Sequence, residues 1–280
     1  MAATPPDRPV PSALRTAVRQ WRENGEPPQR ASSWSRGSWL KYFPGRQAFL
    51  DSLPDSVDRA EAARHAADAV TPEGAEQAFL VAMIWGYGPV GYGPWRTARV
   101  LTENPHAADR LAEVAIVARD SGGLDAFRAL AHEPLRYLGV AFGTKYLRFV
   151  TAALPVETAP ILDAVVRRWL AAHTGWHPNI DEWRPAVYEK YVAWLTSWST
   201  EFDLDADMVE QMIFGSAITQ EGSALWGEQW ASTAGSPARM ARAALLDLQR
   251  LFETADSQAA LEAREHLDEL DRIIQRGWTM

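Results

Sequence analysis

Apolar residues recur at intervals of three and four along most of this chain, which is the spacing of amphipathic helices. The stretch "TPEGAEQAFLVAMIW" adds start signals to this pattern, because Thr71 suits an N-cap and Pro72 suits a first helical turn. No segment alternates with a period of two, so the pattern predicts an all-α fold. Helices are predicted over residues 13–22, within 38–53 and 56–70, and over 72–85, 107–119, 123–131, 143–153, 160–173, 184–200, 205–214 and 237–276.

A repeated Gly-Tyr-Gly-Pro, at residues 86–89 and 91–94, interrupts the helical pattern. Glycine supplies positive φ angles and proline fixes its own φ, so the repeat predicts consecutive tight turns, with a helix resuming at Trp95. Two interpretations are open at this point, namely a rigid structural loop and a turn that contacts a ligand.

The two ends of the chain differ from its middle. We expect a flexible leader over residues 1–30, which are rich in proline, and one compact helical domain over 31–235. Over 236–280 we expect an appended charged helix that packs on the domain or extends it. Because this C-terminal helix is acidic and carries an apolar stripe, it is a candidate for binding a protein partner.

Composition narrows the class of protein. The 47% hydrophobic content supports a real core, and most of the thirteen tryptophans are expected inside it. The lack of cysteine excludes disulfides, thiolate zinc sites and cysteine nucleophiles. The first residues do not show the charged segment followed by an apolar segment that is typical of a signal peptide, and no run of about eighteen apolar residues occurs. We therefore expect a cytoplasmic monomer with no membrane segment.

The formal charge of −8, with a pI near 5.3, argues against indiscriminate binding to nucleic acid. The charge is unevenly distributed, however. Residues 77–102 and 134–156 contain no acidic side chain but do contain arginine, and the second stretch also contains Lys145. A local basic face on an acidic protein is therefore compatible with the sequence.

The stretch "RYLGVAFGTKYLRFV", at residues 136–150, predicts a helix that ends at Leu138, a glycine turn at Gly139, and a second helix that begins at Gly143 and Thr144. The free N–H groups at the start of a helix form a site that binds phosphate. In "APILD", Asp163 opens the next predicted helix, 18 residues after Lys145. Taken singly, Lys145 is an ordinary surface lysine and Asp163 an ordinary N-cap.

Taken together, these residues resemble the helix-hairpin-helix DNA glycosylases, in particular the 8-oxoguanine glycosylase (OGG) branch. In that branch a glycine hairpin ending in Thr-Lys is followed, after a comparable interval, by Pro-x-x-Asp. The resemblance covers roughly residues 75–215, and it departs from the family's Gly-Val-Gly at Ala141-Phe142-Gly143. It implies a DNA repair glycosylase with AP-lyase activity that removes an oxidised purine such as 8-oxoguanine from damaged DNA, with Lys145 as the nucleophile and Asp163 assisting.

The chemistry sets requirements on the surroundings of these residues. A lysine attacks only as the free amine, and since the ordinary lysine pKa is about 10.4, desolvation or a cationic neighbour must favour that form. The candidate contacts to the DNA backbone are Gly139, Gly143, Thr144, Arg148 and Arg167. The candidates for a wedge, or for a site that holds the orphaned partner base, are Tyr87, Tyr92, Trp95, Arg96 and Arg99. The candidates for the base pocket are Trp85, Phe142, Trp169 and Phe214.

Other chemistries find less support. His173 and His177 are four residues apart, but Gly175 and Pro178 disfavour one helix there and a third ligand is missing, so neither a metal nor another cofactor is predicted. The glycine-rich stretch 214–230 lacks a phosphate-loop lysine, and we interpret it as a polar loop. The competing function is a catalytically inactive helix-hairpin-helix module that binds DNA or recruits a partner.

Overall fold

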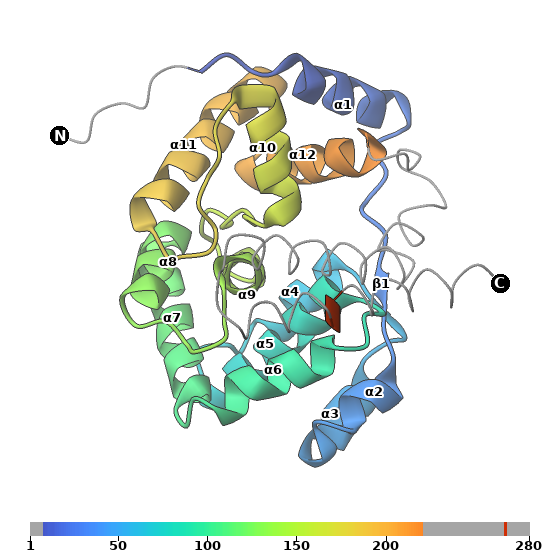
Figure 1. Ribbon diagram of the computed structural model, residues 1–280, viewed down its shortest axis with the longest axis vertical. Coiled ribbons are helices and arrows are strands. Elements are labelled where there is room, and N and C mark those ends of the chain that lie inside the picture. The colour runs from blue at the N-terminus through green and yellow to red at the C-terminus, as the bar shows by residue number, and fades with distance from the viewer. Residues whose placement is uncertain (1–7, 221–265, 268–280) are drawn as a thin grey trace. The chain divides into compact units, whose positions relative to one another are not determined.

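The computed structural model describes residues 8–220 and 266–267. Helices dominate these residues, and the all-α prediction is confirmed; a two-stranded ladder is the exception (Figure 1). The elements are α1 (Ser12–Glu23), β1 (Ser32–Ser33), α2 (Arg36–Leu40), the 3-10 helix η1 (Pro44–Arg46), α3 (Gln47–Ser52), β2 (Ser56–Val57), α4 (Arg59–His65), α5 (Pro72–Tyr87), α6 (Gly93–Thr102), α7 (Ala107–Ser121), α8 (Gly123–His132), α9 (Val140–Ala152), α10 (Ala164–Thr174), α11 (Pro185–Phe202) and α12 (Ala206–Gln220).

Two sequence predictions fall on other parts of the chain. The charged C-terminal helix over 237–276 lies outside the described residues, apart from 266–267, and so does the stretch 221–230 of the predicted polar loop. Within the described ranges, no helix combines the length and the apolar character needed to cross a membrane.

Helix α1 corrects the prediction of a flexible leader over residues 1–30. Its apolar face is buried, with Leu14 fully covered, and α1 packs against α12. The indole Nε1 of Trp21 donates a hydrogen bond of 3.0 Å to the carbonyl of Pro27, which holds the chain after the helix. Residues 12–23 therefore contribute to the hydrophobic core, because the stripe of Leu14, Val18 and Trp21 has the spacing of one helix face.

Helix α5 lies in the hydrophobic core. Its start follows the sequence signals, since the Thr71 hydroxyl accepts a hydrogen bond of 3.1 Å from the Gly74 N–H and Pro72 occupies the first turn. Most of its side chains are buried, and it packs against α4, α7 and α9. A helix that is apolar on all sides is expected to be surrounded by other elements.

The Gly-Tyr-Gly-Pro repeat forms two consecutive tight turns, as predicted, which are closed by hydrogen bonds from the Val90 N–H to the Tyr87 carbonyl (3.2 Å) and from the Gly93 N–H to the Val90 carbonyl (3.1 Å). Helix α5 continues through the first repeat to Tyr87 and ends at Gly88, whose φ is +55°. Helix α6 begins at Gly93, two residues earlier than predicted. Glycine is required at position 93 because a Cβ there would lie 2.6 Å from the ring of Tyr87.

Helices α8 and α9 form the predicted hairpin with shifted boundaries. Helix α8 ends at His132, and α9 begins at Val140 with Gly139 as its N-cap, three residues before the predicted start. Tyr137, in the connection, has a φ of +68°. Helix α9 packs against α4, α5, α7 and α8 and is seen end-on in Figure 1. Lys145 consequently lies in the second turn of α9 and not in the first.

Helices α10, α11 and α12 form a second group, in which α12 packs against both of the others and against α1. Helix α10 begins at Ala164, four residues after its predicted start, because Asp163 caps it. Strands β1 and β2, which the sequence did not predict, form a two-residue antiparallel ladder that pairs Ser32 with Val57. This arrangement brings α9, α10 and α12 together around the charged residues described next.

Candidate active site

Lys145 and Asp163 form a buried ion pair. The Lys145 Nζ lies 2.9 Å from the Asp163 Oδ2, and the two side chains are 8% and 12% exposed. The same Nζ lies 3.4 Å from the carbonyl of Ala141 and 5.2 Å from the centre of the Phe142 ring. The hairpin thus brings together the amine and the acid that the sequence singles out, in a setting nearly closed to solvent.

Asp163 uses its two oxygens differently. Oδ1 accepts the backbone N–H groups of Val165 (3.0 Å) and Val166 (3.1 Å), as an N-cap does, while Oδ2 faces Lys145. Burial alone would raise the pKa of this carboxyl, but the Lys145 ammonium and the N–H donors outweigh burial and lower the pKa. Asp163 can therefore be the N-cap of α10 and a residue of the candidate site at the same time.

The extended segment that precedes Asp163 is fixed by hydrogen bonds to two helices, α9 and α11. Thr151 and Thr144, on α9, accept the N–H groups of Ala159 (2.8 Å) and Leu162 (3.1 Å) through their hydroxyl oxygens. On α11, two buried tyrosine hydroxyls bind the carbonyls between them. They are Tyr188, which donates to Pro160 (2.8 Å), and Tyr191, which donates to Ile161 (2.7 Å). Sequence reasoning assigned these tyrosines no role, although their spacing of three residues places them on one face of a helix.

Gly86 provides the space in which the Lys145 stem lies. A Cβ at this position of α5 would stand 2.8 Å from the Lys145 Cδ and 3.3 Å from the Phe142 ring. Phe142 in turn stacks on Tyr87, with ring centres 4.2 Å apart. The sequence gives Gly86 the role of a turn residue, but it is helical and allows close approach.

Lysine is rare in this chain, which makes the buried one more informative. Of the 28 lysine and arginine residues, three are lysines, at positions 41, 145 and 190. Lys41 and Lys190 are exposed. Lys145 is the buried member of the three, and it faces an acid.

Comparison with protein families adds independent information. A family model described as "Putative 8-oxoguanine DNA glycosylase OGG-like protein" matches residues 25–214, which are 190 of the 280 residues. The chain belongs to this OGG-like family. Searches of curated proteins and of solved structures give no significant match. Membership supports the OGG branch of the helix-hairpin-helix fold and a DNA glycosylase as the general class, which implies binding to DNA.

In this OGG-like protein, three of the predicted backbone contacts are inside the fold. Gly143 is buried, and a Cβ there would lie 2.2 Å from the Trp183 ring. Thr144 is fully buried and binds Leu162, while Arg148 is buried against Asp207. As phosphate contacts these three predictions are wrong for this structure, because the helix begins earlier than the sequence indicates and α9 is covered on several sides.

Two of the predicted backbone contacts lie at the surface. Gly139 is exposed at the N-cap of α9, where the first N–H groups of a helix have no partner within it. The connection before it is held by Trp183, whose Nε1 donates a hydrogen bond of 3.1 Å to the Leu138 carbonyl. Arg167, on α10, is partly exposed, with its Nη1 3.9 Å from an Asp181 carboxylate oxygen.

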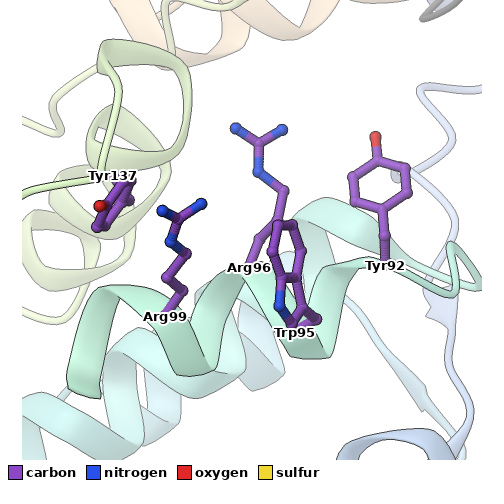
Figure 2. Close-up of a pocket in the computed structure, with 5 residues that line it drawn as sticks. All are labelled: Tyr92, Trp95, Arg96, Arg99 and Tyr137. Carbon is purple, nitrogen blue, oxygen red and sulfur yellow. The ribbon is translucent and has the colours of Figure 1, made fainter. Parts of the chain in front are cut away.

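An aromatic and cationic pocket lies beside this hairpin, with a volume of about 280 Å³ (Figure 2). Four of the five predicted wedge residues line it, and they come from α6 and the residue before it. The exception is Tyr87, which is buried against Phe142. The pocket is lined by Tyr92, Trp95, Arg96, Arg99 and Tyr137.

Tyr137 is the pocket residue that the sequence did not indicate. It comes from the hairpin connection, and Figure 2 shows it opposite Arg99, whose Cζ lies 3.7 Å from its ring centre. Tyr92, Trp95 and Tyr137 are the most exposed large aromatic residues among those described. Exposed aromatic rings beside guanidinium groups form a surface on which nucleobases stack.

The predicted base pocket is not assembled as one group. Trp85 is buried between Phe149, at 5.1 Å between ring centres, and Arg59. Trp169 is a core residue whose Nε1 binds the Ser216 hydroxyl at 3.1 Å. These two are packing residues in this structure. Phe142 and Phe214 are partly buried, and Phe142 is the one beside Lys145.

No cluster of metal-binding side chains occurs among residues 8–220 and 266–267. His173 packs against the Trp169 ring, at 4.7 Å between ring centres, and His177 is exposed.

Proposed function

We propose that this OGG-like protein excises an oxidised purine such as 8-oxoguanine from DNA, with Lys145 as the nucleophile and Asp163 as the assisting acid. The observation that carries the proposal is the 2.9 Å contact between the Lys145 Nζ and the Asp163 Oδ2 in a nearly closed setting. The family assignment supports the class of reaction, and within the part of the chain that the structure describes neither of the two exposed lysines has an ion pair with a carboxylate.

The reaction begins with the free amine of Lys145. Its nitrogen lone pair attacks the sugar C1′, the bond from C1′ to the base nitrogen breaks, and the base leaves with the electron pair and takes up a proton. The amine nitrogen loses a proton, for which the Asp163 carboxylate is the nearest acceptor. Before that transfer, the same carboxylate stabilises the positive charge that develops on the sugar.

Strand cleavage follows from the same covalent bond. The C1′ to O4′ bond breaks, the ring oxygen takes up a proton, and a Schiff base to Lys145 forms. Removal of a C2′ proton then expels the 3′ phosphate by elimination. This sequence requires no metal or redox cofactor and gives the proposed AP-lyase activity.

The surface beside the pair suits the handling of DNA. We assign phosphate binding to the N-terminus of α9 at Gly139 and to Arg167. We also assign two roles to the residues of the aromatic pocket: they supply the wedge that replaces the extruded base, and they hold the orphaned partner base. Their side chains suit these roles because Tyr92, Trp95 and Tyr137 offer stacking faces and Arg96 and Arg99 offer hydrogen-bond donors.

A second candidate function is a DNA-binding module without catalysis. The observation that favours it is the near-complete burial of Lys145 and Asp163, since a reacting sugar must reach the amine. Under this alternative the pair serves only to join α9 to α10.

One experiment separates the two functions. A duplex with a single 8-oxoguanine opposite cytosine is incubated with the wild type and with Lys145→Gln, Lys41→Gln and Lys190→Gln, and base release and strand cleavage are measured. We expect release and cleavage with the wild type and with both surface variants, and neither with Lys145→Gln. DNA binding without release by the wild type, across a panel of oxidised purines, would establish the inactive module instead.

A further inference from the structure

A second group of buried charges lies one turn of α9 away from Lys145. Arg148, on α9, binds Asp207 of α12 through two hydrogen bonds, Nε to Oδ1 at 3.0 Å and Nη2 to Oδ2 at 2.7 Å. Arg59, on α4, reaches the same Asp207 at 3.3 Å and Glu210 at 3.0 Å. We call these four residues, Arg59, Arg148, Asp207 and Glu210, the buried charge cluster.

The two carboxylates of the buried charge cluster accept different numbers of hydrogen bonds. Asp207 accepts hydrogen bonds from Arg59, Arg148 and the Gln211 amide, the last at 3.1 Å. Glu210 is fully buried, and among the described residues it accepts one bond, from Arg59 to its Oε2, while its buried Oε1 has no partner there. A buried carboxylate with an unpartnered oxygen is costly in its ionised form.

The pKa values of the two carboxylates shift in opposite directions. Burial raises the pKa of Asp207 in principle, but Arg59 and Arg148 outweigh burial and lower the pKa. For Glu210 burial dominates, Arg59 compensates only in part, and the nearby carboxylates add to the effect, so the pKa is raised to about 7. At neutral pH, Glu210 is therefore near the midpoint of its titration.

The charged and titratable groups around Glu210 come from α4, α10, α11 and its own helix, α12. Besides Arg59 and Asp207, the Asp163 carboxylate at the start of α10 interacts with it, as do Tyr188 and Tyr191 of α11. The buried residues of α1, which also packs on α12, are apolar. Arg59 interacts electrostatically with Asp163 as well. Asp163, the carboxylate paired with Lys145, is thus one of the groups with which Glu210 interacts.

We propose that Glu210 is a positioning residue that binds and releases a proton inside the protein, and that its charge state controls how readily the amine of Lys145 becomes free to attack. The proposal rests on the function proposed above. With Glu210 protonated, the buried charge cluster carries two cations and one anion. With Glu210 ionised, it carries two of each.

The direction of the effect follows from these charges. A net positive cluster disfavours a further positive charge nearby, so protonated Glu210 favours the free amine of Lys145. As the pH rises through about 7, Glu210 ionises and stabilises the ammonium form again. The rate of attack therefore rises less steeply with pH than deprotonation of an isolated lysine would give.

The test uses a duplex with a preformed abasic site, which separates attack by the amine from cleavage of the base. Borohydride trapping rates are measured from about pH 5 to about pH 9 for the wild type and for Glu210→Gln, whose side chain cannot ionise. We expect the Glu210→Gln curve to be steeper and to be shifted to lower pH by about 0.5 to 1 pH unit, with the same maximum rate. Near pH 8 this corresponds to roughly 3-fold to 10-fold faster trapping.

Glu201→Gln is the matched control. It removes the same charge from an exposed pair with Arg15 at the end of α11, and its curve should coincide with that of the wild type. If the Glu210→Gln curve also coincides with the wild type, the inference is overturned while the proposed function stands. If the wild type itself traps nothing, both are overturned.

A measurement on the wild type alone covers the case in which Glu210→Gln does not fold. Infrared spectra of the full chain, with and without ¹³C-labelled glutamate, report a protonated carboxylic acid directly. We expect an isotope-shifted acid band that disappears as the pH rises through about 7. Loss of every such band below about pH 5, as for ordinary glutamates, would overturn the inference.

Discussion

Helix α9 forms two buried ion pairs one turn apart, and the difference between them lies in the cation. The Lys145 pair has one hydrogen bond of 2.9 Å, with side chains 8% and 12% exposed. The Arg148 pair has two hydrogen bonds to Asp207, with side chains 10% and 7% exposed. Burial does not distinguish the pairs, but a guanidinium cannot lose its proton in a protein, whereas an ammonium can.

The carboxylates show the same contrast. Both oxygens of Asp207 are used by arginine, which makes it a joint between α4, α9 and α12. Asp163 gives one oxygen to the backbone and one to a lysine, and its segment is fixed by hydrogen bonds from α9 and α11. The pair that holds helices together and the pair that we propose for catalysis therefore differ in the cation, and not in the extent of burial.

The largest expected effect comes from Asp163→Asn, which keeps an N-cap but removes the negative charge. We expect base release from the 8-oxoguanine duplex to slow by about 10²-fold to 10⁴-fold, because proton transfer and charge stabilisation are both lost. Single-turnover release measures this effect. Asp205→Asn is the matched control, since Asp205 caps α12 through the Met208 N–H at 2.7 Å, and it should react at the wild-type rate. Equal rates for the two variants would remove Asp163 from the mechanism.

The next effect is on stability. Arg148→Met leaves the Asp207 carboxylate buried with fewer donors, and we expect the free energy of unfolding to fall by about 3 to 5 kcal/mol. Urea denaturation followed by circular dichroism measures the change. Arg15→Met, which breaks the exposed pair with Glu201, should change the midpoint little. If Arg148→Met is as stable as Arg15→Met, the second pair is not the joint described above.

The smallest effect tests the support of Asp163. Tyr191→Phe removes the hydroxyl that donates to the Ile161 carbonyl at 2.7 Å, and we expect a loss of about 1 kcal/mol of stability. Because the bond holds the segment before Asp163, trapping on an abasic duplex should also slow by a few fold. Tyr42→Phe, on an exposed tyrosine, serves as the control. A Tyr191→Phe variant with wild-type trapping would show that the segment holds its place without that bond.

The sequence predicts much of the fold because caps and helical periodicity are local signals. Thr71 and Asp163 mark helix starts, and the resemblance to the OGG branch implies that Lys145 and Asp163 meet. The sequence predicts that α9 starts at Gly143, but its N-cap is Gly139. Both glycines are compatible with a helix start when the sequence is considered alone. This shift moves Gly143 from an exposed turn to a buried contact with Trp183.

The remaining errors come from contacts between distant segments. Arg148 has the appearance of a surface cation in the sequence, and only the approach of α12 makes it a partner of Asp207. Trp169 has the appearance of a stacking platform, but it is covered within the core. Tyr188 and Tyr191 have no local signal of their role, because it depends on where residues 159–162 run. Periodicity identifies a buried face, but it does not identify the element that covers that face.

The most direct test of the central claim is to locate the covalent bond. The wild type is trapped with borohydride on a lesion duplex, and the product is digested at arginine, which keeps Lys145 within residues 137–148 for mass spectrometry. The account predicts that the residual nucleotide is attached to Lys145. Attachment to Lys41, to Lys190 or to the terminal amine would contradict it.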